Sequence, residues 1–256
     1  LLDNAARLAG PGSTIAERRR LAQATLANFA RFALGVLAPS SPGEDPAIEV
    51  VGEPHFREAK AAGRGVLGVS LHMGNYEAAP AALARVIEPV AILYQTDPSG
   101  VFERARSALR TRWGVEEIAL DRSPWFAVRV RAVLRRGGMV LVAGDFGHPP
   151  RPGEPRRVVP FLGDPAPFPL WPVRLSVASG APILPCCLVR VPGAGLRLEV
   201  DPPIFPEPGD DPERIHDRLV GFLEAALRRH PDQWLIVHRY WDPGACRIPA
   251  KGRGER

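Results

Sequence analysis

The chain has 256 residues, which suits one large domain or a domain with an appendage, and 45% of them are hydrophobic, which supports a sizeable core. The formal net charge is +5, and nearly all of the basic residues are arginines, which bind phosphate through paired hydrogen bonds and favour anionic bilayers. Most of this arginine content also fits the amino-acid usage of a GC-rich genome. The three cysteines have neither metal-site spacing nor that of a disulfide framework, so a reducing, cytoplasmic-side location is expected.

The N-terminal region predicts a long helix. Thr14 and Glu17 have the spacing of a capping box, and hydrophobic residues lie on a broad side of the helix that follows, as far as about Leu37. Three arginines, residues 18–20, lie near its start. Such a helix either packs on the core or lies on a membrane beside the arginine cluster, and both alternatives stay open. The sequence contains no apolar run of 18 residues, and we expect no signal peptide within it.

Beyond this segment, residues 1–47, short apolar runs alternate with helical patterns. Strands are expected at residues 48–51, 66–71, 90–94, 115–120, 139–143, 183–190, 196–200 and 234–240, and helices at residues 54–62, 78–86, 102–113, 124–136, 170–179 and 212–229. The alternation predicts an α/β fold with a mostly parallel central sheet flanked by helices. Residues 48–242 would form this domain, residues 146–169 a long proline-rich loop within it, and residues 243–256 a disordered tail.

Polar residues follow the apolar run at residues 66–71, where a buried strand passes into a helix. The chemistry of an α/β sheet usually lies beyond the carboxyl ends of its strands. Gly74 and Asn75 tolerate the backbone conformations of a tight turn, which would bring Glu77 to His72. A carboxylate bonded to one imidazole nitrogen leaves the other nitrogen to act as a base. The alternative is a capping His72 and a Glu77 favoured by the positive end of the helix dipole.

Five further sequence blocks follow this junction. LHMGNYE at residues 71–77 precedes RTRWG at 110–114, GMVLVAGD at 138–145, VPFLG at 159–163, ASGAPILP at 178–185 and QWLIVHRYW at 233–241. In this order the blocks resemble the lipid A late acyltransferases, the lauroyl/myristoyl transferase family, and their relatives that acylate phosphatidylinositol mannosides. These families belong to the glycerolipid acyltransferase superfamily. The resemblance covers roughly residues 48–241.

The resemblance implies an O-acyltransferase that moves a fatty acyl chain from a thioester donor to a hydroxyl of a lipid. Acyl carrier protein is the implied donor, with acyl-CoA as the alternative. The implied acceptor is a glycolipid such as a lipid A precursor, with phosphatidylinositol mannoside or another phospholipid or lysophospholipid as the alternative. No nucleic-acid partner and no cofactor are implied. The expected location is the cytoplasmic face of a bacterial inner membrane, with peripheral binding or an anchor that this chain does not include.

The resemblance also implies roles for individual residues. His72 is expected to be the general base, Glu77 the carboxylate that orients it, and Asp145 a further catalytic residue at a strand end. Arg110 or Arg112 matches a functional arginine of the family, and either residue could instead lie on a solvated helix face.

Three more residues are expected to contact substrate. Gly74 and Asn75 belong to the turn after His72, and Arg239 could bind a phosphate or pair with a carboxylate.

Other kinds of site are weighed against this interpretation. His148 could join Asp145 and His72 around a metal ion, but no recognised ligand spacing supports this, and no metal is expected. A Gly-x-Ser-x-Gly motif is absent, which argues against a covalent acyl-enzyme. Two alternatives from other classes are a lipid-binding domain without activity and a hydrolase that uses the His72–Glu77 pair with water.

Overall fold

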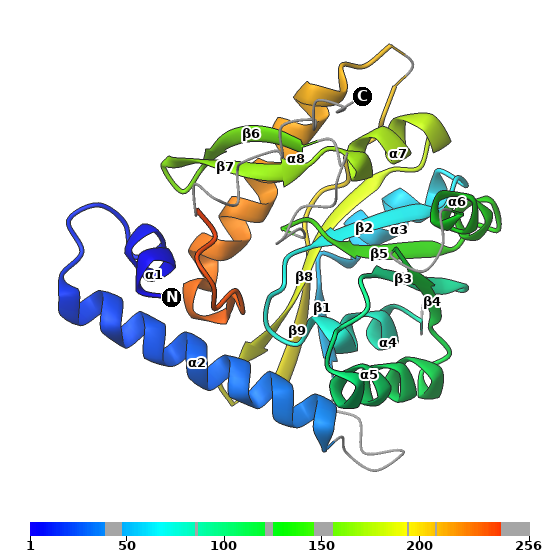
Figure 1. Cartoon of the computed structure of the whole chain (residues 1–256). Coiled ribbons are helices and arrows are strands. Elements are labelled where there is room, and N and C mark those ends of the chain that lie inside the picture. The colour runs from blue at the N-terminus through cyan, green and yellow to red at the C-terminus, as the bar shows by residue number, and fades with distance from the viewer. Residues whose placement is uncertain are drawn as a thin grey trace, which may run out of the picture.

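A seven-stranded sheet forms the centre of the protein in the computed structural model, which describes residues 1–38, 48–84, 87–120, 125–145, 156–193, 195–207 and 209–241 (Figure 1). The strand order is β1-β9-β8-β2-β5-β3-β4. The β8–β9 pair is antiparallel and the other neighbouring pairs are parallel. The predicted α/β fold with a mostly parallel sheet is therefore confirmed. The strands are β1 (Ile48–Val51), β2 (Val66–Ser70), β3 (Val90–Tyr94), β4 (Glu116–Ala119), β5 (Met139–Ala143), β8 (Ile183–Val191) and β9 (Gly195–Val200).

Helices cover both faces of this sheet because its central strands are apolar on both sides (Figure 1). On one face of the sheet, a buried hydrophobic cluster includes residues of α3 (Glu53–Ala61) and α4 (Ala79–Leu83). On the opposite face, a second buried cluster includes residues of α6 (Phe126–Arg135), α7 (Trp171–Ser179) and α8 (Pro212–Arg229). A further helix, α5 (Gly100–Arg112), packs beside β4.

The N-terminal segment forms two helices, α1 (Leu2–Leu8), which the sequence pattern did not predict, and α2 (Ile15–Leu37). The predicted capping box opens α2: the Thr14 hydroxyl accepts from the backbone N–H of Glu17, and the Glu17 carboxylate accepts from that of Thr14.

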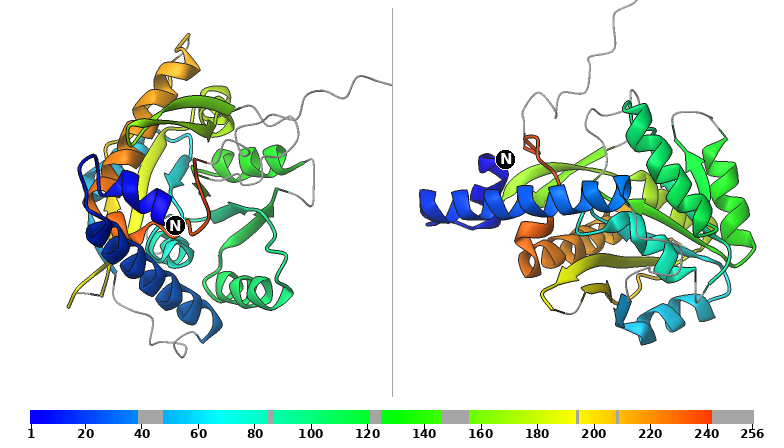
Figure 2. Two further views of the ribbon diagram at one scale, coloured as in Figure 1. Left: turned by 60° about the vertical axis from the view of Figure 1, so that its left-hand side comes forward. Right: turned by 90° about the horizontal axis from the view of Figure 1, so that it is seen from below.

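Helix α2 lies along the outside of the molecule (Figure 2). One side of it packs on α5 and on a short 3₁₀ helix, η2 (Pro231–Gln233), and buries Phe32 and Val36. No helix within the described ranges has both the length and the apolar character needed to cross a bilayer.

Three segments differ from the expectations. The region expected to be a loop contains an antiparallel pair, β6 (Arg156–Phe161) and β7 (Asp164–Pro169), whose prolines are tolerated because the pair stands apart from the main sheet. The helix expected at 78–86 begins instead as a 3₁₀ turn, η1 (Tyr76–Ala78), followed by the short α4. The strand expected at 234–240 is wrong, since a single β-bridge pairs Trp234 with Met73. The expected tail, 243–256, and the first part of the expected loop, residues 146–155, lie outside the described residues.

Asn4 of α1 holds the segment after Trp234 in place. Its side-chain amide donates to the carbonyl oxygens of Ile236 and His238 at 2.9 and 2.8 Å, and its side-chain oxygen accepts from the backbone N–H of Tyr240 at 3.1 Å. Asn4 is itself buried. One side chain therefore takes the place that a neighbouring strand would have in satisfying these backbone groups.

We expect Asn4→Ala to lower the free energy of unfolding by about 1–3 kcal/mol, because it leaves buried backbone groups without partners. Urea unfolding measures this loss, and amide hydrogen exchange should become faster at residues 236–240. Leu2→Ala, at an exposed position on the same helix, is the control. Equal effects of the two substitutions would contradict this role for Asn4.

Candidate active site

The ends of β2 and β5 place two of the predicted site residues together. These strands are parallel neighbours, and Ser70 is paired with Ala143. His72 and Asp145 each follow these paired positions by two residues, so both leave the sheet at the same edge. Asp145, which the sequence analysis placed at a strand end, therefore lies beside His72 at one edge of the sheet.

Asp145 accepts hydrogen bonds from three groups. His72 Nδ1 lies 2.9 Å from its Oδ1, and the His72 backbone N–H donates to both of its oxygens at 3.1 and 3.0 Å. The indole Nε1 of Trp234 donates to Oδ2 at 2.8 Å. The side chain of Asp145 is completely buried, whereas that of His72 is 24% exposed. Asp145 therefore fixes the orientation of the His72 ring through Nδ1.

The donors around Asp145 keep its carboxyl group ionised. Burial raises its pKa, but the charge and hydrogen bond of His72 and the bond from Trp234 lower it more, so the pKa lies below its usual value. A buried anion beside an imidazole stabilises the imidazolium that forms when the imidazole takes up a proton.

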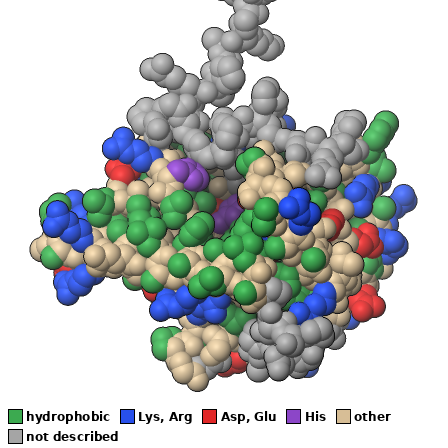
Figure 3. Space-filling view, turned by 60° about the horizontal axis from the view of Figure 1, so that its bottom comes forward, with side chains coloured by type: hydrophobic (Ala, Val, Ile, Leu, Met, Phe, Trp, Pro, Cys, Tyr) green, Lys and Arg blue, Asp and Glu red, His purple; other side chains and the backbone are tan. Residues whose placement is uncertain are grey.

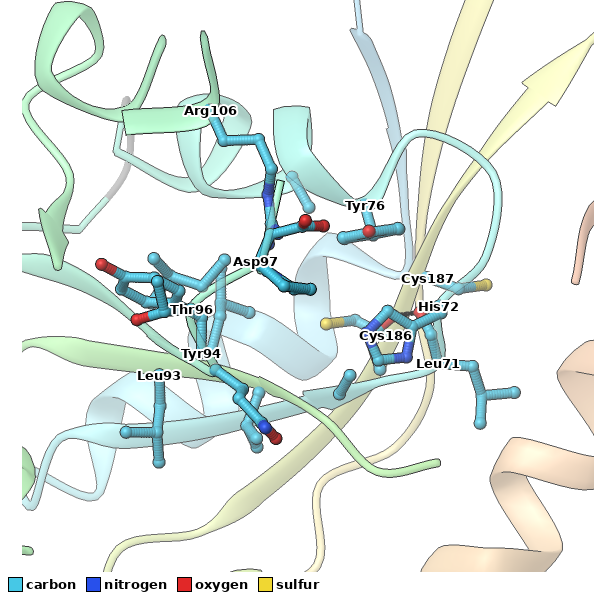
Figure 4. Close-up of a pocket in the computed structure, with 18 residues that line it drawn as sticks. Leu71, His72, Tyr76, Leu93, Tyr94, Thr96, Asp97, Arg106, Cys186 and Cys187 are labelled. Carbon is cyan, nitrogen blue, oxygen red and sulfur yellow. Dashed lines mark hydrogen bonds between the residues drawn. The ribbon is translucent and has the colours of Figure 1, made fainter. Parts of the chain in front are cut away.

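A cavity of about 420 Å³ opens beside His72, between the carboxyl ends of β2, β3 and β5 and the middle of β8. Figure 4 shows His72 and Tyr76 on one side of it, Tyr94 and Thr96 on the other, and Arg106 reaching in from α5. Most of the wall is apolar and comes from β3, β5, β8 and the residue that follows β2: Leu71, Ile92, Leu93, Leu141, Val142, Ala143, Cys186 and Cys187. A largely apolar cavity with a few polar groups at one end is the usual form of a small-molecule site.

Glu77 does not orient His72, and that prediction is wrong. Arg106 Nε donates to its Oε1 at 2.6 Å, and Arg110 donates to Oε1 through Nη2 at 2.8 Å and to Oε2 through Nε at 3.0 Å. The 3₁₀ turn η1 directs Glu77 toward α5, where two arginines one helical turn apart bind it. Asp145 holds the position on Nδ1 that the sequence pattern had suggested for Glu77.

The Glu77 ion pairs are buried. Glu77 is 1% exposed and Arg110 is fully buried, with its guanidinium carbon 4.2 Å from the ring centre of Tyr94. Burial raises the pKa of Glu77, but the charges of Arg110 and Arg106 lower it more, so it stays ionised. Arg110 is enclosed between Glu77, Tyr94 and Glu117 and is not among the residues that line the cavity.

The comparisons with known proteins identify the family to which the chain belongs. The profile of the family described as "Bacterial lipid A biosynthesis acyltransferase" matches residues 3–242. The chain belongs to this family. A phosphatidylinositol mannoside acyltransferase of Mycolicibacterium smegmatis is 26% identical over 234 residues, which are 86% of this chain and 72% of that protein. A lipid A biosynthesis lauroyltransferase of Escherichia coli is 26% identical over 205 residues, which are 79% of this chain and 64% of that protein.

The protein is therefore an acyltransferase, and its family indicates an acyl donor and a lipid acceptor as the general classes of its substrates.

In this acyltransferase Gly74 and Asn75 hold the turn against β8. The φ angle of Gly74 is 59°, and a Cβ atom there would lie 2.0 Å from the carbonyl oxygen of Leu188, so a side chain does not fit. The Gly74 N–H donates to the carbonyl of Gln233 at 2.9 Å, and the Asn75 N–H donates to that of Leu188 at 3.1 Å. These bonds give the two residues a structural role, while their contact with substrate stays a prediction.

Two further predicted residues lie away from the cavity wall. Arg112 is half-buried on α5 and Arg239 is exposed, and neither is among the residues that line the cavity. His148 lies outside the described residues. Within the described ranges, no group of three or more His, Cys, Asp or Glu side chains is arranged to hold a metal ion.

Three residues near His72 were missed by the sequence analysis: Arg106, Trp234 and Tyr76. Arg106 precedes Arg110 by four residues on α5, and this i, i+4 spacing could have suggested that the two bind one carboxylate. Tyr76 packs edge-on to His72, with ring centres 5.0 Å apart, and stacks on Phe32 of α2 at 4.7 Å. No sequence signal assigns Trp234 to Asp145.

We expect Glu77→Gln to lower the free energy of unfolding by about 3–5 kcal/mol, because it leaves two arginines buried without a compensating charge. The folded-state pKa of Glu77 lies below its ordinary value of 4.5, so its contribution is present above that pH and lost as the pH falls through the folded-state value. The stability difference between wild type and variant should therefore shrink in acid. Denaturant unfolding at several pH values measures both effects.

Glu117→Gln is the matched control, since the Glu117 side chain is 25% exposed and binds the same Arg110. A loss of activity in Glu77→Gln at unchanged stability would instead favour a direct catalytic role for Glu77.

Proposed function

We propose that this protein is an O-acyltransferase that moves a fatty acyl chain from a thioester donor to a hydroxyl of a glycolipid, with His72 as the general base. The supporting observation is the contact between His72 Nδ1 and the buried Asp145 at the mouth of the apolar cavity. The donor is acyl carrier protein or acyl-CoA, and the acceptor is a lipid A precursor or, alternatively, a phosphatidylinositol mannoside or another phospholipid. The two relatives act on lipids of these kinds by their names.

The proposed reaction uses His72 twice. Nε2 takes the proton of the acceptor hydroxyl. At the same time the hydroxyl oxygen attacks the carbonyl carbon of the thioester, and a carbon–oxygen bond forms. The carbon–sulfur bond then breaks, and His72 returns the proton to the leaving sulfur, which departs as a thiol. Asp145 stays ionised throughout and stabilises the imidazolium between these two steps.

The cavity gives this reaction a place for the acyl chain. Its volume of about 420 Å³ lies within the usual range of ligand pockets, roughly 300–1,000 Å³. The two thiols in its wall are poor nucleophiles, since burial raises the pKa of Cys186 to about 12 and also raises that of Cys187. A direct transfer by His72 is therefore better supported than a covalent acyl-cysteine.

Helix α2 supports a peripheral position on a membrane, which we propose is the cytoplasmic face of the bacterial inner membrane. Its outer side exposes large hydrophobic residues, with Ile15 at 61%, Leu26 at 50% and Leu34 at 64% exposure. Figure 3 shows hydrophobic side chains gathered along this face of the molecule, with Lys and Arg side chains around them. An amphipathic helix of this kind binds the interface through its apolar side and binds anionic lipids through its cations.

We expect His72→Ala and Asp145→Asn each to lower the transfer rate by about 10²- to 10⁴-fold, because the base is lost in one and its charge partner in the other. The double variant should lose little more than His72→Ala alone, since the two residues act as one unit. Single-turnover assays with acyl carrier protein and with acyl-CoA measure the rate and identify the donor. Glu49→Gln, at an exposed carboxylate of the edge strand β1 that binds Arg197, is the control.

Two outcomes would contradict the proposal. Near-normal turnover by a folded His72→Ala variant would remove His72 as the base. Free fatty acid as the product, at equal rates with and without a lipid acceptor, would identify a hydrolase instead.

We expect Leu26→Ser combined with Leu34→Ser to weaken binding to anionic vesicles, because it removes apolar surface that would enter the bilayer. Vesicle co-sedimentation measures the loss, and binding of the wild type should fall as salt is added. Val128→Ser, at a position of α6 that is 59% exposed, should bind like wild type. Equal binding by all three proteins would contradict a bilayer contact through α2.

A further inference from the structure

Arg190, at the end of β8, is an arginine without an acidic partner. Its Nε atom is buried and has no hydrogen-bond partner among the described residues. Its backbone N–H and carbonyl are both bound by the side chain of Gln233, at 2.8 Å each. The side chain is therefore not needed to hold the backbone, and no ion pair within the described part of the chain offsets its charge.

A second arginine, on α2, is connected through Asn28 to η2, the segment that binds Arg190. Arg31 is exposed and donates to the side-chain oxygen of Asn28 at 3.1 Å, and no carboxylate of the described residues pairs with it. Asn28 in turn donates to the backbone carbonyl of Asp232 at 3.0 Å and to its carboxylate at 2.9 Å. Asp232 precedes Gln233, so α2, η2 and the end of β8 bring Arg31 and Arg190 to one cluster.

The carboxylate of Asp232 in this cluster is bound by Asn28, and among the described residues it forms an ion pair with neither arginine. Two like charges that share no paired anion destabilise each other. Burial lowers the pKa of Arg190, and the nearby charge of Arg31 lowers it further. Other arginines of the described residues that are at least as enclosed, such as Arg106 and Arg110, bind carboxylates. Arg190 is thus placed where its charge costs stability, which is typical of a residue kept to bind an anionic ligand.

We propose that Arg31 and Arg190 together bind the phosphate group of a lipid headgroup at the bilayer surface. Guanidinium groups match phosphate oxygens through paired hydrogen bonds, and two of them offset the charge of one phosphate. The neighbouring turn of α2 exposes Leu34, three residues after Arg31 and therefore on the same side of the helix. A ligand with a phosphate above an apolar chain fits this combination of cations and apolar surface.

The site is close to the catalytic turn but separate from it. Asn75 binds the carbonyl of Leu188, and Arg190 follows two residues later, roughly 7 Å along β8. Gln233 binds Gly74 through its backbone carbonyl and Arg190 through its side chain. Headgroup binding would therefore fix the position of the protein on a bilayer near the mouth of the His72 site. The proposed membrane contact of α2 supports only one part of this inference, namely that the phosphate belongs to a membrane lipid.

The test is calorimetric titration of the full chain carrying His72→Ala, so that no transfer takes place, with dihexanoyl phosphatidylglycerol below its micelle concentration. We expect Arg190→Gln and Arg31→Gln each to weaken binding by about 10- to 100-fold, the range for a hydrogen bond to a charged group. Arg190→Lys should recover part of the affinity. Arg19→Gln, which removes an exposed arginine from the same helix, should bind unchanged. The melting temperature of Arg190→Gln without lipid should be no lower than that of the parent protein.

Inorganic phosphate and dihexanoylglycerol, which lacks the phosphate, complete the design. The lipid with phosphate should bind more tightly than either. Equal affinity for inorganic phosphate would overturn the lipid assignment, and equal affinity for dihexanoylglycerol would overturn the phosphate site. Unchanged lipid binding in Arg190→Gln, or an equal loss in Arg19→Gln, would overturn the proposal altogether. If Arg190→Gln fails to fold, Arg31→Gln, at an exposed position, decides in the same assay. Because the lipid is monomeric in solution, this result is independent of whether α2 binds vesicles or His72 transfers acyl groups.

Discussion

The buried carboxylate of Asp145 is the interaction on which the site depends. Its two oxygens accept from the ring and backbone of His72 and from the indole of Trp234, so one side chain joins the ends of β2 and β5 to the segment after η2. A fully buried anion is costly unless donors surround it. The donors keep Asp145 ionised. In turn, Asp145 holds these donors, including the His72 ring, in fixed positions.

Two buried carboxylates near His72 thus have different partners and different consequences. Asp145 accepts from an imidazole that can gain or lose a proton, whereas Glu77 is bound by two guanidinium groups that keep their protons at any accessible pH. The charge of Glu77 is therefore neutralised locally, and its effect is to fix α5 against the turn that follows His72. Tyr76, between the His72 ring and Phe32 of α2, extends this support to the N-terminal helix.

The sheet could be predicted from sequence because its central strands are short apolar runs separated by helical patterns, as at Val66–Ser70 and Met139–Ala143. Asp145 contacts His72 because β2 and β5 are neighbours in the sheet. The sequence predicts that the carboxyl ends of parallel strands lie at one edge, but it does not predict which strands are neighbours. The direction of Glu77 could not be predicted, since a 3₁₀ turn rather than an α-helix follows Gly74. The segment after Trp234 has the apolar pattern of a strand, yet a distant side chain, Asn4, satisfies its backbone groups.

The arginines near the site differ in whether a carboxylate binds them, and this difference distinguishes a structural role from a ligand-binding role. Arg106 and Arg110 lie inside the protein with carboxylates on their guanidinium groups, and their removal would leave Glu77 as a buried anion. Arg190 is half-buried with its Nε enclosed, and within the described residues it pairs with no carboxylate, while the charge of Arg31 acts on it. Folding alone gives no reason to keep such a pair, because replacing either residue by a neutral one would relieve the repulsion. Its position between α2 and the turn that carries His72 connects the outer face of the protein to the site at the sheet edge.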